Sequence, residues 1–286
     1  ATALYAKLGA NAGCASVLSL TGVLAKNLSE PLGYSGFGLH LFLSTLLSGF
    51  LFTLVVYVLY KGYKVKADNP LKLSEIPKFN RDQWFTIIAI IVMVICCIGF
   101  KLDTGLFAFA AAAVLILLGA VDEKKAIKGI PWGTLVFICG VGVLINVIDT
   151  LGGITLISDF LTKFMSEHTA APILAATSGI LSWVSSTTGV VMPTLFPIAA
   201  DVCKTFGGAN YVELISAITA TSFAAAISPL STGGAIIMSS YSAARETSTE
   251  ELNKMFKTLF LLSVGNVLLN VLLSALGVFK LGGLFY

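Results

Sequence analysis

Long apolar runs alternate with short polar segments along most of the chain. The runs cover residues 39–60, 84–100, 106–121, 132–148 and 256–278. Each run reaches or approaches the ~20 residues that a helix needs to cross a hydrocarbon layer about 30 Å thick. The pattern therefore predicts an all-α polytopic membrane protein in which these runs are the spans.

The composition argues against a water-soluble globular protein. Apolar residues make up 56% of the chain and charged residues 12%, whereas a soluble domain has roughly 45–50% and 25%. A soluble fold of 286 residues needs a charged shell that this sequence cannot supply.

Basic residues gather in three segments between the apolar runs, namely residues 61–82, 122–129 and 245–257. Short loops rich in lysine and arginine stay on the cytoplasmic side of a membrane. With all three segments inside, the spans alternate in direction and the C-terminus lies outside. We expect a multi-pass protein of the bacterial inner (plasma) membrane in this orientation.

Two stretches are apolar enough for a membrane but contain residues that interrupt helices. The first, residues 13–22, carries Gly13, Ser16, Ser19, Thr21 and Gly22. The second lies within residues 211–241 and reads Ser228-Pro229-Leu230-Ser231-Thr232-Gly233-Gly234. Proline removes a backbone donor, and glycine loosens the chain. In lipid such a break is tolerated only where the freed backbone groups line a cavity or face other protein.

The two interrupted stretches resemble each other. Ser16–Gly22 aligns with Ser228–Gly234, with Ser, Leu, Ser and Gly in register, and each stretch precedes a long apolar run. The predicted topology runs the first from inside to outside and the second from outside to inside. Broken helices at matching places in halves of opposite orientation are typical of an inverted-repeat secondary transporter. Chance matching of small residues is the alternative.

This interpretation divides the chain into two repeats and a linker. Residues 1–60 form the C-terminal portion of a first repeat, consisting of a broken helix and a span. Residues 61–82 form a cytoplasmic linker, and residues 83–286 form the second repeat. Within the second repeat, residues 154–165 predict an amphipathic helix on the outer surface of the membrane.

A third irregular stretch, residues 170–205, follows the surface helix. Its two apolar arms, 171–184 and 190–203, are each about 14 residues long, or ~21 Å of helix, which is too short to span. The polar turn Ser185-Ser186-Thr187-Thr188-Gly189 separates the arms. Two short arms about a polar turn predict a re-entrant hairpin that enters from outside.

Charged side chains are absent from the centres of the predicted spans. A proton relay or a cation/proton antiporter places such a group near the midplane, and an intramembrane enzyme needs a His–carboxylate or metal set. The sequence disfavours all three. Asp149 and Glu213 fall at span ends, where we expect solvated charges. We expect Asn146, Asn266 and Asn270 to be interhelical hydrogen-bond partners.

The breaks and the hairpin tip offer hydroxyls, bare carbonyls and helix N-termini. Helix N-termini favour a carboxylate, and unwound carbonyls with hydroxyls favour Na⁺. We predict substrate contacts from Ser185, Ser186, Thr187, Thr188, Ser228, Ser231, Thr232, Ser16 and Ser19. The candidate Na⁺ ligands are Ser185, Thr187, Gly189, Ser228, Ser231, Gly233, Gly13 and Thr21. The alternative is that these small residues only let helices pack closely.

Three motifs carry a family resemblance. They are Trp132-Gly133-Thr134-Leu135-Val136-Phe137 leading into Gly140-Val141-Gly142, the tip Ser185-Ser186-Thr187, and Ser228-Pro229-Leu230-Ser231-Thr232-Gly233-Gly234. With them the chain resembles the divalent anion/sodium symporter family of the ion transporter superfamily, most of all its malonate and dicarboxylate carriers. The family has Ser-Asn-Thr at the tip, so Ser186 stands where its members carry Asn.

The resemblance implies two inverted repeats, each a hairpin followed by a broken helix, in a homodimer that works by an elevator motion. It makes residues 11–21 the first broken helix and residues 39–60 the last span of the first repeat. We therefore expect the chain to be the C-terminal part of a longer protein.

The expected function is secondary active transport of small di- or tricarboxylates, by symport with Na⁺ or alternatively H⁺. The expected partners are the anionic solute, the lipid bilayer and a second copy of the chain. We expect no cofactor besides the coupling cation, no enzyme activity and no nucleic acid. The rivals are a cation/proton antiporter of the same architecture and a non-transporting membrane subunit.

Overall fold

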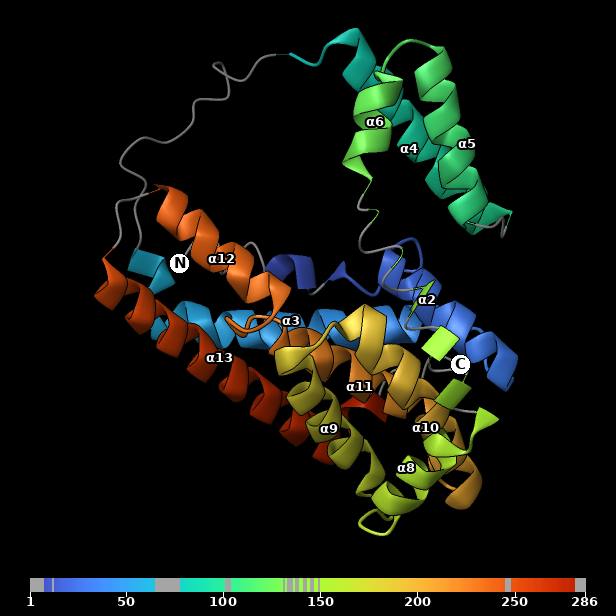
Figure 1. Ribbon diagram of the computed structural model, residues 1–286, viewed down its shortest axis with the longest axis vertical. Helices are drawn as coiled ribbons and strands as arrows, with labels where there is room; N and C mark the ends of the chain where they lie inside the picture. The colour runs from blue at the N-terminus through green and yellow to red at the C-terminus, as the bar shows by residue number, and fades with distance from the viewer. Residues whose placement is uncertain are drawn as a thin grey trace. The chain divides into compact units, whose positions relative to one another are not determined.

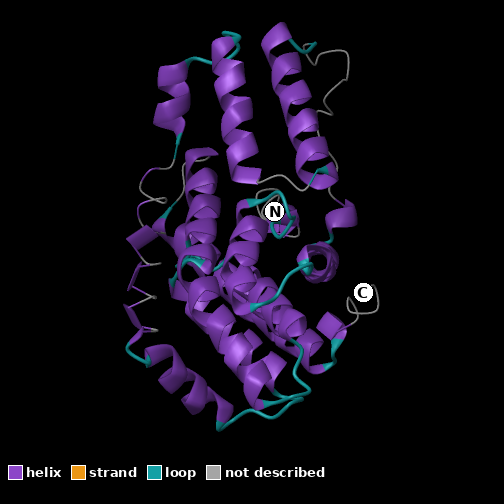
Figure 2. Cartoon of the chain, turned by 90° about the vertical axis from the view of Figure 1, so that its right-hand side faces the viewer, coloured by secondary structure: helices purple, strands orange, loops and turns teal. Residues whose placement is uncertain are grey.

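The computed structural model describes residues 8–11, 13–64, 78–100, 104–130, 132, 136, 139–140, 143–144, 147–148, 150–244 and 248–280. Helices and turns account for the ordered elements in these residues, and no strand occurs among them (Figure 2). The chain forms two compact units, one of residues 1–62 and 137–286 and the other of residues 63–136. The predicted all-α architecture is therefore confirmed.

The smaller unit is built on two apolar helices that lie side by side, α4 (Arg81–Gly99) and α5 (Thr104–Leu117). Asn80 caps α4 because its side chain accepts from the Gln83 backbone N–H while the Gln83 side chain accepts from that of Asn80. A short helix, α6 (Glu123–Gly129), follows with Asp122 as its N-cap. The predicted runs 84–100 and 106–121 thus form α4 and α5, with the second ending near residue 117.

The larger unit contains most of the described elements (Figure 1). They are α2 (Leu20–Ser29), η1 (Glu30–Leu32), α3 (Gly38–Leu59), α8 (Gly153–Thr162), α9 (Ala170–Val184), the π-helical turn η4 (Thr187–Val191), α10 (Met192–Thr205), α11 (Tyr211–Ala225), α12 (Thr232–Ala244) and α13 (Thr249–Ala275). Residues 8–11 and 13 are also helical. The predicted span 132–148 falls largely outside the described residues.

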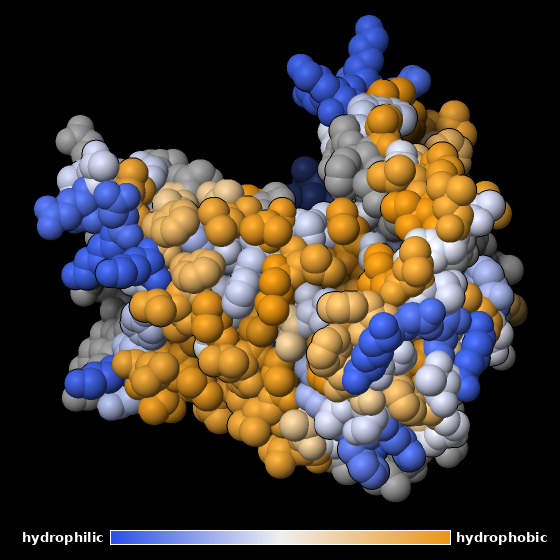
Figure 3. All heavy atoms as spheres, turned by 60° about the horizontal axis from the view of Figure 1, so that its bottom comes forward, coloured by the Kyte–Doolittle hydropathy of each residue, from blue (hydrophilic) through white to orange (hydrophobic). Residues whose placement is uncertain are grey.

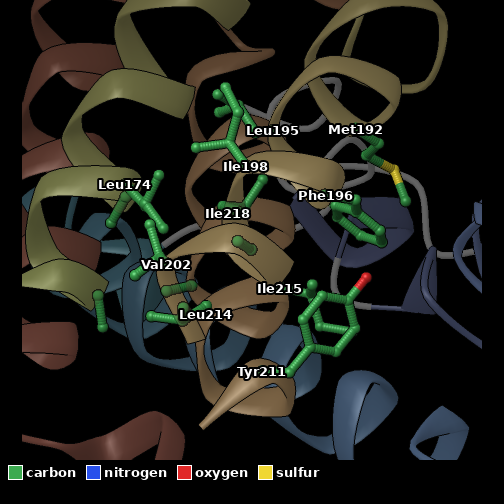
Figure 4. Packing of buried hydrophobic residues seen from close by; sticks show 14 of the residues in the cluster. Leu174, Met192, Leu195, Phe196, Ile198, Val202, Tyr211, Leu214, Ile215 and Ile218 are labelled. Atoms are coloured by element: carbon green, nitrogen blue, oxygen red, sulfur yellow. The ribbon is translucent and has the colours of Figure 1, made fainter. Parts of the chain in front are cut away.

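Helix α11 is the centre of the larger unit. All but two of its 15 residues are buried, and it packs against α3, α9, α10 and α13. Figure 4 shows how side chains of α9, α10 and α11 meet in the core, among them Leu174, Phe196, Ile198 and Ile215. A helix that is covered on all sides needs apolar or small residues around its whole circumference, which explains why the sequence of α11 shows no polar stripe.

Helices α3 and α13 are long and apolar enough to cross a membrane, with 22 and 27 residues. Figure 3 shows a broad apolar surface with hydrophilic side chains gathered near its borders. Helix α13 begins at Thr249, earlier than the predicted run at 256, because Ser248 and Glu251 form a capping box there. Its first turns are therefore polar, and its apolar part matches the predicted span.

A glycine allows the close approach of α9 to α11 and α13. A Cβ added at Gly179 lies 2.7 Å from Cγ1 of Val267 and 3.1 Å from Cγ2 of Thr221. Both neighbours are β-branched side chains with few rotamers to move into. Close contact of these three helices therefore depends on the missing side chain at Gly179.

We predict that Gly179→Ala lowers the free energy of unfolding by about 1–3 kcal/mol, because overfilling a packed interface forces its neighbours to shift. Gly265→Ala on α13 is the matched control, since a Cβ there meets nothing within 4 Å. Because alanine is the better helix former, the control should be neutral or stabilising by up to about 1 kcal/mol. Thermal unfolding of the detergent-solubilised protein measures both. Equal stability of the two variants would contradict the packing role of Gly179.

Candidate functional site

Two helices, α9 and α10, are joined by a short polar tip whose hydroxyls bond mostly to nearby groups. Ser185 ends α9 and donates to the carbonyl of Leu181 (2.6 Å). Ser186 is exposed, and its Oγ accepts from the backbone N–H of Gly189 (3.1 Å), which starts the π-helical turn. Thr188 is half-buried and Gly189 is buried. Ser186 therefore acts as a turn cap in this structure.

Thr187 connects the tip to α11. Its side chain is buried, and its Oγ1 lies 3.0 Å from Oγ of Ser182, which donates to the carbonyl of Ser222 (2.7 Å). Because the proton of Ser182 goes to the carbonyl, the hydroxyl of Thr187 is the donor in the pair. The tip is thus tied to the last turn of α11, directly before the helix breaks.

The second break lies between α11, which ends at Ala225, and α12, which begins at Thr232. Oγ of Ser231 lies 2.7 Å from the carbonyl oxygens of both Ala226 and Ser228 and accepts from the N–H of Gly234 (3.4 Å). Ser228 is fully buried, and its Oγ accepts from the N–H of Leu230 (3.3 Å). Ser231 therefore hydrogen-bonds to two carbonyls of the break and caps the helix that follows it.

The first break is built in the same way. Residues 8–11 and 13 are helical, α2 begins at Leu20, and Ser19 is its N-cap. Oγ of Ser19 bonds to the carbonyls of Cys14 and Ser16 and accepts from the N–H of Gly22 (3.1 Å). Ser16 and Ser19 are half-buried, Gly13 is exposed and Thr21 is buried. The hydroxyl of Ser19 is thus used within its own break, as that of Ser231 is.

The two breaks correspond residue by residue at a single offset. Asn11 donates to the carbonyl of Phe223 (2.8 Å), and these two residues are 212 positions apart. The same offset relates Ser19 to Ser231 in both their bonds and their capping roles. The alignment of the two stretches is therefore matched by their geometry, and equivalent positions of the two stretches touch each other at Asn11 and Phe223.

The break within residues 211–241 covers residues 226–231, two residues earlier than the stretch 228–234 expected from the sequence. Helix resumes at Thr232 because Ser231 caps it, so Gly233 and Gly234 lie in the first turn of α12 and are buried. A Cβ at Gly234 would overlap the carbonyl oxygen of Ser228, and one at Gly22 would overlap that of Ser16. These glycines permit close backbone approach and do not loosen the chain.

The expectation of a solvated charge at Glu213 is wrong. Glu213 lies in the first turn of α11 and is only 5% exposed. Its Oε2 lies 3.8 Å from Nζ of Lys280. The positive end of the helix dipole and the ammonium both stabilise the carboxylate. Asp149 and Asn146 lie outside the described residues. Asn266 and Asn270 do form interhelical hydrogen bonds, to Ala224 and Ser48 respectively.

The described residues contain no group of three or more His, Cys, Asp or Glu side chains that could hold a metal ion. A cavity of about 10 Å³ lies beside the break, and Asn11, Thr45, Ser48 and Asn266 are the polar residues of its mostly apolar lining. A cavity of this size holds one water molecule at most.

The sequence did not predict a role for Ser182, Trp183 and Ser263. Ser182 and Ser263 contact the end of α11, and Trp183 contacts Ser263. Ser182 and Ser263 donate to the carbonyls of Ser222 and Ala225, and Trp183 donates to Ser263. The available signal was the polar face that Ser178 and Ser182 give to an otherwise apolar α9. Serines in membrane helices usually only pack, so this signal is weak by itself.

We predict that Gly22→Ala and Gly234→Ala each distort their break, because the new methyl group meets a backbone carbonyl that side-chain motion cannot relieve. Each should cost about 1–3 kcal/mol of stability and speed hydrogen exchange of the amides in the altered break. Gly9→Ala is the control for Gly22→Ala, because a Cβ there meets nothing within 4 Å. Exchange as slow in either break variant as in the parent protein would show that the close approach is unimportant.

A family model described as Citrate transporter (CitMHS) matches residues 4–228, which is more than half of the chain. The matched segment includes the first break, the hairpin tip and the whole of α11, and it ends inside the second break. No curated protein matches the chain. The match confirms the resemblance at the level of the ion transporter and divalent anion symporter kind, and it confirms a membrane transporter rather than an enzyme. The chain belongs to the citrate transporter family.

Proposed function

We propose that the chain carries small di- or tricarboxylates across the membrane as a secondary active transporter coupled to Na⁺. The observation that carries the proposal is the pair of breaks with the same hydrogen bonds at one offset. Two equivalent interruptions of opposite direction are what an inverted-repeat transporter uses to bind solute and ion. A non-transporting subunit has no need of them.

The charge of the substrate is the reason for proposing a coupling cation. A dicarboxylate brings two negative charges, and each helix N-terminus offers only about half a positive charge. The described tip and second break, residues 185–191 and 226–234, contain no Arg or Lys. Removing a dianion from water without compensating charge is costly. Co-bound Na⁺ supplies that charge, with the predicted ligands in the tip and the breaks.

The predicted Na⁺ ligands lie in two places, one formed by the tip and the second break and the other in the first break. Thr187 and Gly189 in the tip, and Ser228, Ser231 and Gly233 at the second break, are buried next to or within a few residues of the end of α11. A cation bound there would contact carbonyl oxygens that now accept hydrogen bonds, and it would replace the donors of those bonds. Gly13 and Thr21 are the predicted Na⁺ ligands in the first break, where Ser16 and Ser19 are the predicted substrate contacts.

The proposed movement is an elevator motion within a homodimer. The division of the chain supports it, because residues 63–136 form a compact unit separate from the one that holds both breaks and the tip. A unit that holds both breaks and the tip together can move as a body with its substrate. The re-entrant character of the α9–α10 hairpin, the bacterial inner membrane and the outside C-terminus belong to the same proposal.

Proton antiport deserves comparison because Glu213 is a buried carboxylate. Glu213 is in the first turn of α11, whereas the break follows Ala225, so about 18 Å of helix separates them. Glu213 is also paired with Lys280. Its position therefore favours a structural ion pair over an ion-coupling group at the break.

We predict that the affinity for citrate or a smaller dicarboxylate rises steeply with Na⁺. Below saturation, each coupled ion should tighten the apparent Kd about tenfold for a tenfold rise in Na⁺, by thermodynamic linkage. Isothermal titration of the purified full-length protein, with choline replacing Na⁺ at constant ionic strength, measures this. A second series at several pH values tests H⁺ as the coupling ion. Affinity independent of both ions would exclude cation coupling.

We predict that Thr187→Val weakens substrate binding and its Na⁺ dependence together, because valine keeps the shape of threonine and removes the hydroxyl. Thr187→Ser keeps the hydroxyl and should bind within a few-fold of the parent. Thr177→Val on α9 is the control, since among the described residues its Oγ1 bonds to the carbonyl of Ile173 in its own helix (2.9 Å). If Thr187→Val keeps the parent Na⁺ dependence, Thr187 is not a cation ligand.

A further inference from the structure

The end of α11 poses a problem of hydrogen bonding. The last carbonyls of a helix have no intrahelical partner, and those of α11 are in the interior of the larger unit. Backbone N–H groups of Ala226 and Ser228 donate to the carbonyls of Phe223 (3.2 Å) and Ala225 (2.9 Å). Side chains add a donor to each of four successive carbonyls: Ser182 to Ser222 (2.7 Å), Asn11 to Phe223 (2.8 Å), Asn266 to Ala224 (3.2 Å) and Ser263 to Ala225 (2.9 Å). We call Asn11, Ser182, Ser263 and Asn266 the carbonyl cap.

The carbonyl cap draws its members from three separate parts of the chain. Ser182 belongs to α9, Ser263 and Asn266 belong to α13, and Asn11 belongs to the helical residues before the first break. All four are buried, with exposures of 8% or less. Four donors on four successive carbonyls fix the direction in which α11 ends, and hence the path of the break that begins at Ala226.

A relay links the hairpin to the same place a second time. The indole N–H of Trp183, next to Ser182 at the end of α9, donates to Oγ of Ser263 (2.9 Å). Ser263 then donates to the carbonyl of Ala225 (2.9 Å). The ring of Trp183 lies against that of Phe260, with centroids 5.7 Å apart. Two neighbouring residues of the hairpin arm therefore reach two carbonyls beside the break.

A second layer holds one member of the cap in place. Nδ2 of Asn270 donates to the backbone oxygen and to Oδ1 of Asn266 (2.9 and 3.2 Å). Ser48 of α3 donates to Oδ1 of Asn270 (2.6 Å). These bonds orient the Asn266 amide so that its N–H₂ group faces Ala224. The orientation of the cap is thus set from α3 through α13.

We propose that the carbonyl cap and the Trp183–Ser263 relay are positioning elements that hold the hairpin tip and the second break as one unit. Order gained at either segment is then transmitted to the other, so that an ion bound at the break also orders the hairpin. This last step rests on the proposed cation coupling, whereas the mechanical link stands without it.

The competing explanation is ordinary helix packing. Interhelical hydrogen bonds in membranes are common and individually average only about 0.6 kcal/mol. Such bonds would contribute to general stability and would not control one segment. The two explanations differ in which residues lose protection when a bond is removed. The proposal predicts a change at residues 226–234 alone, and ordinary packing predicts an even change over the larger unit.

Ser263→Val and Ser263→Thr form the decisive pair, because they have the same shape and differ only in the hydroxyl. Hydrogen–deuterium exchange of the purified full-length protein, without substrate or Na⁺, is measured for peptides of residues 226–234 and of α3. Loss of a buried bond of this kind should raise exchange at the break about tenfold in the Val variant and leave the Thr variant near the parent. Ser274→Val is the control, a buried serine of α13 whose hydroxyl has no hydrogen-bond partner among the residues that the structure describes.

An unchanged break, or exchange raised equally in α3, overturns the proposal. So does an equal effect of Ser274→Val. Transmission to the hairpin is tested with Trp183→Phe, which keeps an aromatic ring and removes the N–H. In the parent, 100 mM Na⁺ should slow exchange at both the tip and the break, and in Trp183→Phe only at the break. Slowing at both in the variant overturns the relay. If Na⁺ has no effect on the parent, the cation coupling of the proposed function is refuted. The link between hairpin and break is then tested by the Ser263→Val and Ser263→Thr variants alone.

Discussion

The main constraint on this structure is that a helix stopping inside a membrane protein must still satisfy its terminal carbonyls. Water solves the problem at a surface, but it is not available in lipid. In this chain the last carbonyls of α11 accept from side chains of α9, α13 and the residues before the first break, and two of them also accept from the backbone N–H groups of Ala226 and Ser228. The need for these donors explains why serine and asparagine occur in otherwise apolar helices. It also explains why helices far apart in sequence converge on residues 222–226.

The same constraint accounts for the construction of the breaks. In each, one serine serves two carbonyls and caps the following helix, and a glycine three residues later lets the turned backbone come close. The serine and the glycine are both needed, because the capping bond brings together atoms that a Cβ would hold apart. Repetition of this arrangement at one offset indicates that the two breaks are variants of one structural unit.

The sequence was sufficient for features that depend on local composition. The apolar runs at 39–60, 84–100 and 106–121 correspond to α3, α4 and α5, and the predicted polar turn 185–189 falls between α9 and α10, with residues 187–189 inside η4. Features that depend on contacts between distant segments were not predictable. Glu213 is buried because Lys280, near the other end of the second repeat, reaches it. The roles of Ser182 and Ser263 follow from where α11 ends in space, which no local pattern specifies. The substrate and ion contacts of the candidate site stay predictions.

The position of Trp183 has a consequence for spectroscopy. The chain has three tryptophans, Trp84, Trp132 and Trp183, and the first two belong to the unit of residues 63–136. Trp183 is therefore the single tryptophan of the unit that holds the two breaks, and its indole N–H donates a hydrogen bond beside one of them. Indole emission shifts with the polarity and hydrogen bonding of its surroundings. With phenylalanine at positions 84 and 132, light emitted by the protein reports on one indole, about one helical turn from the hairpin tip, without any attached dye.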